Sequence, residues 1–150
     1  MMNTEELAKS FGMKVHEENG LFVERHYDHK GSDRPASGSI YYYVNKDERT
    51  EFHRIDCDEY WCYNTGSTIE LWIIYPDGKL TIKKCGITEG AEPTVFVSKG
   101  AIFASRHPKD CNEGTFITAI TVPRFKYEGF ELFNKEEMIK KYPFVSSFWE

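Results

Sequence analysis

The 150-residue sequence lacks a long apolar run, a concentrated basic segment and a closely spaced pair of cysteines. No apolar stretch approaches the roughly 20 residues that a membrane-spanning helix requires. The formal net charge is -5, and lysines and arginines occur as scattered pairs such as Lys83 and Lys84. The chain therefore lacks the basic stripe that collects nucleic-acid phosphates. We expect neither a membrane nor a nucleic acid among its partners.

The four cysteines are Cys57, Cys62, Cys85 and Cys111, and none of them belongs to a C-x-x-C pair. This spacing argues against a structural zinc site. The opening segment MMNTEELAKSFGMK carries acids where a secretory signal peptide has a basic end and an apolar core. We therefore expect a cytoplasmic protein whose free thiols are buried or half-buried as small hydrophobic side chains.

Short segments rich in β-branched and aromatic residues follow one another through most of the chain, and they predict β-strands. They span residues 21–27, 39–44, 50–55, 59–64, 68–75, 79–84, 94–98 and 115–122. The sequence YPDGK at 75–79 predicts a hairpin turn, because Asp-Gly supplies the turn geometry between two apolar runs. Many short strands without intervening helices indicate a sandwich or a barrel, in one domain over residues 1–150.

Each end of the chain has the signature of a short helix. Asn3 with Glu6, and Asn134 with Glu137, have the spacing of a capping box. The polar, Gly/Ser/Pro-rich segment 28–38 is predicted to be a mobile loop, and residues 106–114 form a second predicted loop.

The strand over 68–75 is apolar on both faces. Ile69, Leu71 and Ile73 share one face, while Trp72 and Ile74 lie on the other. Aromatic residues make up 15% of the chain. This apolar surface exceeds what one small barrel can bury, so we expect a homodimer in which a strand or helix of one subunit covers the other.

The segment FHRIDCDEYWCYNTG at 52–66 resembles the pattern F-H-R-[IL]-x-S-D-E-x-W-H-F-H-x-G of a cupin family, cupin 5 or DUF985. Four further blocks resemble that family in the same order, so that the resemblance covers about residues 11–143. These blocks are GMKVHEENGLFVERHY, ASGSIYYYV, VFVSKGAIFASR and VPRFKYEGFEL. The resemblance implies an all-β, single-domain cupin, which is a double-stranded β-helix or jelly-roll-like barrel and usually a dimer. The capping boxes add short N- and C-terminal helices.

Most metal ligands of the general cupin motifs are absent from this sequence. Glu59 and Gly66 keep the E-(x)6-G spacing, and His53 meets the position of the first histidine. Ile55 and Phe103 stand where the resemblance places the second and third histidines. A stable site for a first-row metal usually has three or more protein ligands. We therefore expect no metal and no other cofactor, and a metal-dependent dioxygenase is disfavoured.

Strand alternation places Glu59, Trp61 and Tyr63 on one face of their strand and His53 on one face of the strand before it. If these faces line the barrel, one pocket holds an imidazole, a carboxylate and two rings. His53 and Glu59 are then the candidate catalytic pair, a base with an orienting partner. The alternative is a structural polar pair whose members only satisfy each other.

The candidate ligand-binding residues are Arg54, Trp61, Tyr63, Tyr41, Phe103, Arg106 and Glu24. An arginine can grip an anionic group in bidentate fashion, although a surface salt bridge is the alternative role for each arginine. The sequence thus supports a cupin that binds a small polar or anionic metabolite, such as a sugar derivative, inside the barrel. Metal-free proton transfer of the isomerase or epimerase type is the hypothesised activity, by analogy with cupin epimerases of nucleotide sugars.

A non-catalytic ligand-binding or sensory cupin is the alternative function. The segment Trp61-Cys62-Tyr63-Asn64 favours it, because the family resembled here has W-H-F-H at these positions. If those histidines serve the family's chemistry, that chemistry is altered in this chain.

Overall fold

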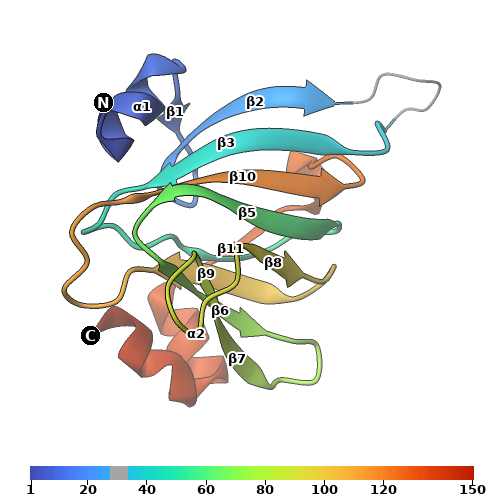
Figure 1. Ribbon diagram of the computed structural model, residues 1–150. Helices are drawn as coiled ribbons and strands as arrows, with labels where there is room; N and C mark the ends of the chain where they lie inside the picture. Colours follow the sequence, from blue (N-terminus) through green and yellow to red (C-terminus); the bar gives the residue numbers. More distant parts are fainter. Residues whose placement is uncertain (28–33) are drawn as a thin grey trace.

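The structure, a computed structural model, describes residues 1–27 and 34–150. Within these residues the strands form two antiparallel sheets that face one another (Figure 1). The six-stranded sheet has the order β1 (Lys14–Val15), β2 (Leu21–Tyr27), β3 (Gly38–Val44), β10 (Thr115–Val122), β5 (Asp58–Gly66) and β8 (Thr94–Val97). The five-stranded sheet has the order β11 (Glu131–Phe133), β4 (Phe52–Arg54), β9 (Ile102–Arg106), β6 (Ile69–Ile74) and β7 (Leu80–Cys85). This arrangement confirms the predicted all-β fold.

Three strands were not predicted from the residue pattern, and each has a physical reason. Strands β1 and β11 have two and three residues, too few for alternation to be seen. Strand β9 is buried on both faces from Ile102 to Ser105, so it shows no alternation of polar and apolar residues.

The predicted hairpin turn joins β6 to β7. The backbone N–H of Tyr75 donates to the carbonyl of Lys79 at 3.0 Å, and Gly78 donates to Tyr75 at 2.8 Å. Gly78 has a φ of 85°, a left-handed conformation that glycine adopts without steric cost. The mobile-loop prediction over 28–38 falls largely on residues 28–33, which lie outside the described residues.

Both terminal helices have the predicted capping boxes. Helix α1 spans Thr4–Ser10 and α2 spans Lys135–Lys141. In each, the asparagine side chain accepts from the N–H of the glutamate three residues later, whose carboxylate accepts from the asparagine N–H. Two 3-10 helices, η1 (Tyr127–Gly129) and η2 (Pro143–Trp149), complete the helical structure of the described residues.

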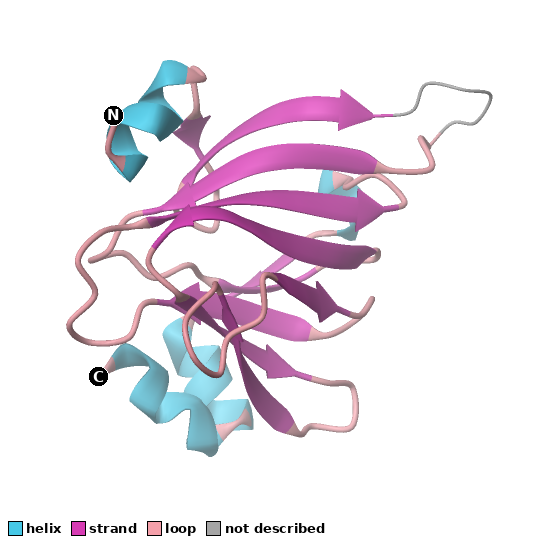
Figure 2. Ribbon diagram, viewed as in Figure 1, coloured by secondary structure: helices cyan, strands magenta, loops and turns pink. Residues whose placement is uncertain are grey.

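The prediction that β6 is covered on both faces is confirmed. Its Leu71 packs into the core between the sheets, together with Trp61 and Phe103. Its Trp72 faces outward into a second core with Phe148. This second core also contains side chains of α2 and η2, which cover the outer face of the five-stranded sheet (Figure 2).

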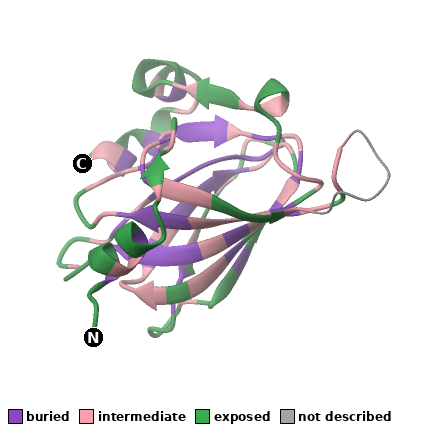
Figure 3. Cartoon of the chain, turned by 90° about the horizontal axis from the view of Figure 1, so that it is seen from above, coloured by how far each residue is buried: buried purple, intermediate pink, exposed green. Residues whose placement is uncertain are grey.

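Helix α1 lies against one end of the six-stranded sheet, where Ala8 packs with Tyr43 and Phe116 (Figure 2). Buried residues follow the strands, whereas the helices carry mostly exposed ones (Figure 3). All four cysteines are free and buried or half-buried, as predicted. Among the described residues, no helix is both long enough and apolar enough to cross a bilayer.

Candidate functional site

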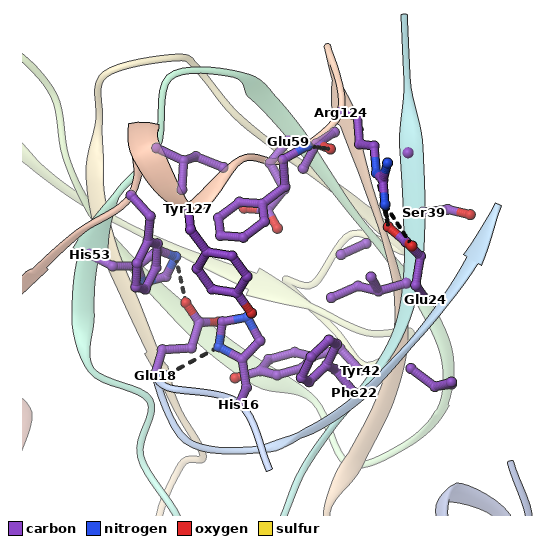
Figure 4. Close-up of a pocket in the computed structure, with 18 of the residues that line it drawn as sticks. His16, Glu18, Phe22, Glu24, Ser39, Tyr42, His53, Glu59, Arg124 and Tyr127 are labelled. Atoms are coloured by element: carbon purple, nitrogen blue, oxygen red, sulfur yellow. Dashed lines mark hydrogen bonds and ion pairs between the residues drawn. The ribbon is translucent and has the colours of Figure 1, made fainter. Parts of the chain in front are cut away.

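A cavity of about 480 Å³ lies against the inner face of the six-stranded sheet (Figure 4). Strands β2 and β3 line it with Phe22, Ile40 and Tyr42, and further walls come from β4, β5, β10 and the segment 124–130. About half of the lining side chains are apolar or aromatic, and charged groups stand among them. This composition is typical of a site for a small molecule.

A buried ion pair forms one wall of the cavity. Nε2 of His53 lies 2.8 Å from Oε2 of Glu18, and the two side chains are 3% and 9% exposed. Nδ1 of His53 lies 2.9 Å from the carbonyl oxygen of Glu51. Because a carbonyl oxygen only accepts, Nδ1 carries a proton, and both ring nitrogens of His53 are engaged.

The two members of this pair hold each other in the charged state. Burial lowers the pKa of His53, but the Glu18 carboxylate outweighs burial, and the net pKa is raised above its ordinary value. Burial acts to raise the pKa of Glu18, but His53 outweighs it, and the net pKa is lowered. The pair is therefore an imidazolium and a carboxylate, with opposite charges that compensate one another away from water.

A tight turn carries Glu18 to this position. The N–H of His16 donates to the carbonyl of Gly20, and the N–H of Asn19 donates to that of His16. Asn19 has a φ of 76°, a conformation that asparagine tolerates better than most residues. The N–H of Glu51 then donates to the carbonyl of Glu18 at 2.8 Å, which fastens the turn beside β4.

His16 belongs to the same turn and also lines the cavity. Its Nδ1 accepts from the backbone N–H of Glu18 at 3.1 Å, which holds the ring against the turn. The ring packs edge-on against Phe22, with ring centroids 4.8 Å apart.

Glu59 faces the same cavity but, unlike the ionised Glu18, it is protonated. Burial, and next the negative charge of Glu18, raise the pKa of Glu59 from 4.5 to about 8. His53 and the indole N–H of Trp61 lower this pKa by smaller amounts. Within the described chain, Oε2 of Glu59 and Nε1 of Trp61 have no partner in hydrogen-bond geometry. Glu59 is thus a neutral carboxylic acid at neutral pH.

Arg124 and Glu24 form a second, more exposed charged pair on the cavity wall. Nε and Nη2 of Arg124 donate to the two carboxylate oxygens of Glu24 at 3.0 and 2.8 Å. The guanidinium carbon lies 3.6 Å from the ring centroid of Tyr27. The carbonyl of Arg124 accepts from Nε of Arg34 at 2.7 Å, and Arg34 is itself paired with Asp56.

The structure brings three of the sequence-derived candidates together on the cavity wall, namely His53, Glu59 and Glu24. It corrects the expected catalytic pair, because the carboxylate bound to His53 is Glu18 and not Glu59. The reason is the 16–20 turn, which places Glu18 against the imidazole from a part of the chain that strand alternation does not describe.

Three other candidates point into the barrel but do not line the cavity. Trp61 and Phe103 are each 1% exposed and belong to the core between the sheets. Tyr63 packs against that core, and its hydroxyl donates to the carbonyl of Gly66 at 2.6 Å. Alternation predicted the face of Trp61 and Tyr63, and the resemblance to the cupin motif indicated Phe103, but neither could predict that this part of the interior is filled.

The last three candidates lie outside the cavity. Arg54 pairs with Glu131 at 2.8 Å. Tyr41 faces the outer side of the six-stranded sheet, while the next residue, Tyr42, lines the cavity.

Arg106, also a sequence candidate, lies on the outer side of the five-stranded sheet. Its guanidinium contacts the ring of Trp72, donates to Glu70 at 3.2 Å and binds carbonyls of η2. These contacts hold η2 to the sheet, which is the structural role of a salt-bridged arginine.

Several cavity residues were missed by the sequence analysis, chiefly Glu18, Tyr42 and Arg124. Two signals pointed toward Glu18 and Arg124, and none toward Tyr42. The turn HEENG at 16–20 lies in a block that resembles H-P-E-G-G of the family, and RFKYEGF at 124–130 places three aromatic residues within six positions. All three of these aromatic side chains line the cavity.

The residues at the cupin metal positions do not fit a metal ion. Ile55 and Phe103 have no donor atoms, and both nitrogens of His53 are already engaged. Over residues 1–27 and 34–150, no group of three or more His, Cys, Asp or Glu side chains could hold a metal ion.

Comparisons with known proteins agree with this architecture. The family model described as "Cupin superfamily (DUF985)" matches residues 5–133. A Shewanella oneidensis protein of known structure is 27% identical, with a TM-score of 0.90 over 98% of this chain and 94% of that chain. A hypothetical protein from Leishmania major is 24% identical, with a TM-score of 0.87 over 95% of this chain and 93% of that one.

A more distant structure extends the fold comparison to an enzyme. L-ribose isomerase from Cellulomonas parahominis, solved with L-psicose, is 10% identical, with a TM-score of 0.55 over 71% of this chain and 61% of that chain. At this identity the likeness shows the fold alone. No curated protein matches the sequence significantly.

Proposed function

Since this chain belongs to the DUF985 family of the cupin superfamily, we propose that its barrel binds a small polar metabolite, such as a sugar derivative with a carbonyl group. We further propose that it moves a proton on that metabolite without a metal, as an isomerase or epimerase does. One observation carries the proposal, which is that two buried carboxyl groups of opposite protonation state face one cavity.

Two titratable groups whose surroundings separate their pKa values are suited to act as an acid and a base. Glu59 is protonated at neutral pH, because burial and the charge of Glu18 raise its pKa to about 8. It can donate a hydrogen bond, and then a proton, to a substrate oxygen. Glu18 is ionised and can accept a proton, while His53 holds its carboxylate in place.

The proposed step is an enolisation. Glu18 removes the proton from the carbon next to the carbonyl, and the C–H electron pair forms a carbon–carbon double bond. The carbonyl π electrons move to oxygen, which receives the proton of Glu59. If Glu18 returns this proton to the former carbonyl carbon while the hydroxyl on the carbon first deprotonated gives its proton to the Glu59 carboxylate, the carbonyl moves by one carbon and the product is an isomer. If the enol turns over and Glu18 returns the proton to the opposite face of the original carbon while the enol O–H gives its proton back to Glu59, the product is an epimer. His53 is a positioning residue here, since neither of its nitrogens is available to the substrate.

The walls support a ligand that has a ring or a carbon skeleton with one apolar face. Phe22, Tyr42 and Tyr127 offer ring faces and edges around the two carboxyl groups (Figure 4). Aromatic rings provide large, rigid apolar surfaces for such a ligand, while the few polar groups fix its orientation. The L-ribose isomerase, which shares the fold, is consistent with a sugar in a barrel of this kind.

The test begins with the compound that native mass spectrometry finds in protein purified from cells, or with a panel of aldoses and ketoses if none is retained. NMR in D₂O then follows exchange of the C–H next to the carbonyl. We expect exchange with the unmodified protein and at least a 100-fold loss in Glu59→Gln and Glu18→Gln, because general acid–base groups contribute about 10²–10⁴.

Glu70→Gln is the matched control, because Glu70 pairs with Arg106 outside the cavity and should leave exchange unchanged. Circular dichroism shows whether each variant is folded. Undiminished exchange in folded Glu59→Gln would overturn the proposed chemistry. Binding without exchange in the unmodified protein would instead support the alternative of a non-catalytic ligand-binding cupin.

We also propose a homodimer formed by the outer face of the six-stranded sheet. The outer face of the five-stranded sheet is covered by α2 and η2, whereas α1 covers only one end of the other sheet. Beyond α1, the rings of Tyr60 and Phe96 contact one another at a tilt, with centroids 5.0 Å apart, and remain 38% and 39% exposed. A second copy of the same face would cover this pair.

Light scattering at micromolar concentration tests the dimer. We expect twice the mass of the chain, and the monomer mass in Phe96→Lys. Ile82→Lys is the control, because Ile82 is 44% exposed on β7 of the other sheet. A monomer mass for the unmodified protein would overturn this proposal.

A further inference from the structure

The charged groups of the cavity are buried at its inner end and partly exposed at its outer end. His53 and Glu59 are 3% and 8% exposed, whereas the side chains of Arg124 and Glu24 are 30% and 40% exposed. Lys14 on β1 is exposed and also lines the cavity. The buried acid and ion pair therefore mark the inner end, and the arginine, glutamate and lysine mark the outer end.

The cavity is cationic although the chain is acidic. Among the described lining residues, the cations Lys14, His53 and Arg124 face only two carboxylates, those of Glu18 and Glu24, because Glu59 is protonated. The whole chain has a formal net charge of -5. The excess positive charge lies at the outer end, since His53 and Glu18 cancel each other at the inner end.

Arg124 is held in place while part of its guanidinium remains available. Its backbone carbonyl is fixed by Arg34, and its guanidinium stacks on Tyr27. Nε and Nη2 donate to Glu24, but Nη1 makes no hydrogen bond within the described part of the chain. A guanidinium in a fixed orientation with unused donors is suited to bidentate recognition of an oxyanion.

The carboxylate of Glu24 is a weak competitor for that oxyanion. The pair with Arg124 is partly exposed to solvent, and exposed ion pairs contribute little net stability. The side chain of Lys14 has no hydrogen-bond or ion-pair partner among the described residues, so its ammonium group is a second available cation on the cavity wall.

We infer that Arg124 and Lys14 select a ligand that carries an oxyanion group, a phosphate or a carboxylate, at the end facing the solvent. The inference rests on the proposed function and narrows its substrate class to sugar phosphates or sugar acids and similar anionic metabolites. In this arrangement the oxyanion occupies Arg124 in exchange for Glu24, and the uncharged carbonyl end of the ligand reaches Glu59.

Calorimetric titration with two pairs of probes tests this inference. Ribose 5-phosphate is compared with ribose, and benzoate is compared with benzyl alcohol, so that each pair differs in its anionic group. We expect at least one anion to bind ten-fold or more tightly than its neutral parent. Which pair shows the difference distinguishes phosphate from carboxylate recognition.

Variants then assign the effect to the outer end of the cavity. Arg124→Gln should abolish the preference for the anion, Lys14→Gln should reduce it several-fold, and Glu24→Gln should increase it, because the competing carboxylate is removed. Arg54→Gln is the matched control, since Arg54 forms a partly exposed pair with Glu131 outside the cavity.

Equal affinity for anion and parent in both pairs would overturn the inference, as would a preference that survives in Arg124→Gln. The experiments distinguish a failure of this inference from a failure of the proposed function. Glu59→Gln tests proton exchange, whereas Arg124→Gln tests only the choice between charged and neutral probes.

Discussion

The interior of this barrel has two halves, and the same strands contribute to both. The filled half is the packed core between the sheets, and the hollow half is the cavity. Strand β5 places Trp61 in the filled half, where it is 1% exposed, and Glu59 two residues earlier on the cavity wall. Strand β3 likewise contributes Val44 to the core and Ile40 to the wall. Strand alternation therefore decides which side chains point inward, but not whether the space they reach is filled. Elements beyond the strands, the 16–20 turn and the segment 124–130, shape the hollow half.

The largest expected effect comes from breaking the buried pair in the hollow half. His53→Ala leaves Glu18 buried without a partner, and losing one member of a buried ion pair costs about 3–5 kcal/mol. Urea denaturation should show this loss in the free energy of unfolding. The double variant Glu18→Gln/His53→Gln should recover much of it, because no unpaired charge remains. A near-wild-type stability for His53→Ala would contradict this, because it would show that water in the cavity solvates the unpaired Glu18 carboxylate.

Removing an apolar side chain should lower the free energy of unfolding more in the filled half than in the hollow half. Leu71 is fully buried in the core between the sheets, so Leu71→Ala should lower the free energy of unfolding by about 2–5 kcal/mol. Ile40→Ala removes a similar side chain that lines the cavity, where fewer contacts are lost, and its cost should be clearly smaller. Equal losses in the two variants, measured by the same denaturation, would remove the distinction between the halves.

The hollow half should also make stability depend on pH. The pKa of Glu59 is raised from 4.5 to about 8, so the folded state holds a proton that the unfolded state releases above pH 4.5. Its contribution to stability is complete below that pH and is lost as pH rises, by about 1 kcal/mol per pH unit between pH 5 and 8. Relative to Glu59→Gln, the unmodified protein should therefore become steadily less stable over this window. Parallel pH profiles for the two proteins would contradict the raised pKa.

The smallest effect is expected at the boundary of the filled half. Tyr63→Phe removes one hydrogen bond to the carbonyl of Gly66, which should cost about 0.5–1.5 kcal/mol. Ligand affinity should not change, because Tyr63 does not line the cavity. A ten-fold loss of affinity in this variant would restore the sequence-based assignment of Tyr63 to the ligand site.

Much of the fold was predictable because strands, turns and helix ends have patterns that can be recognised within a few neighbouring residues. The eight predicted strands, the Asp-Gly turn and both capping boxes appear as expected, and the two-faced pattern of β6 matches its two cores. Strand β9 escaped prediction because a fully buried strand has no alternation to detect.

The site was less predictable because it depends on contacts between distant segments. Glu59 and His53 could be found from motif spacing within one continuous segment of the chain. The partner of His53 could not, since Glu18 comes from a turn more than thirty residues earlier that reaches β4 only in the folded chain. Tyr41 was chosen over Tyr42 because three successive tyrosines give no sign of which one faces inward.

The hydrogen bonds around Glu51 close a ring that has a consequence for ligand binding. The N–H of Glu51 donates to the carbonyl of Glu18, its own carbonyl accepts from His53, and His53 closes the ring on the Glu18 carboxylate. Backbone and side chains thus fix the base and its partner before any ligand arrives. A preorganised site loses little conformational entropy on binding, so the affinity of a ligand reflects its contacts more directly. The inner wall of this barrel is therefore preorganised for its ligand.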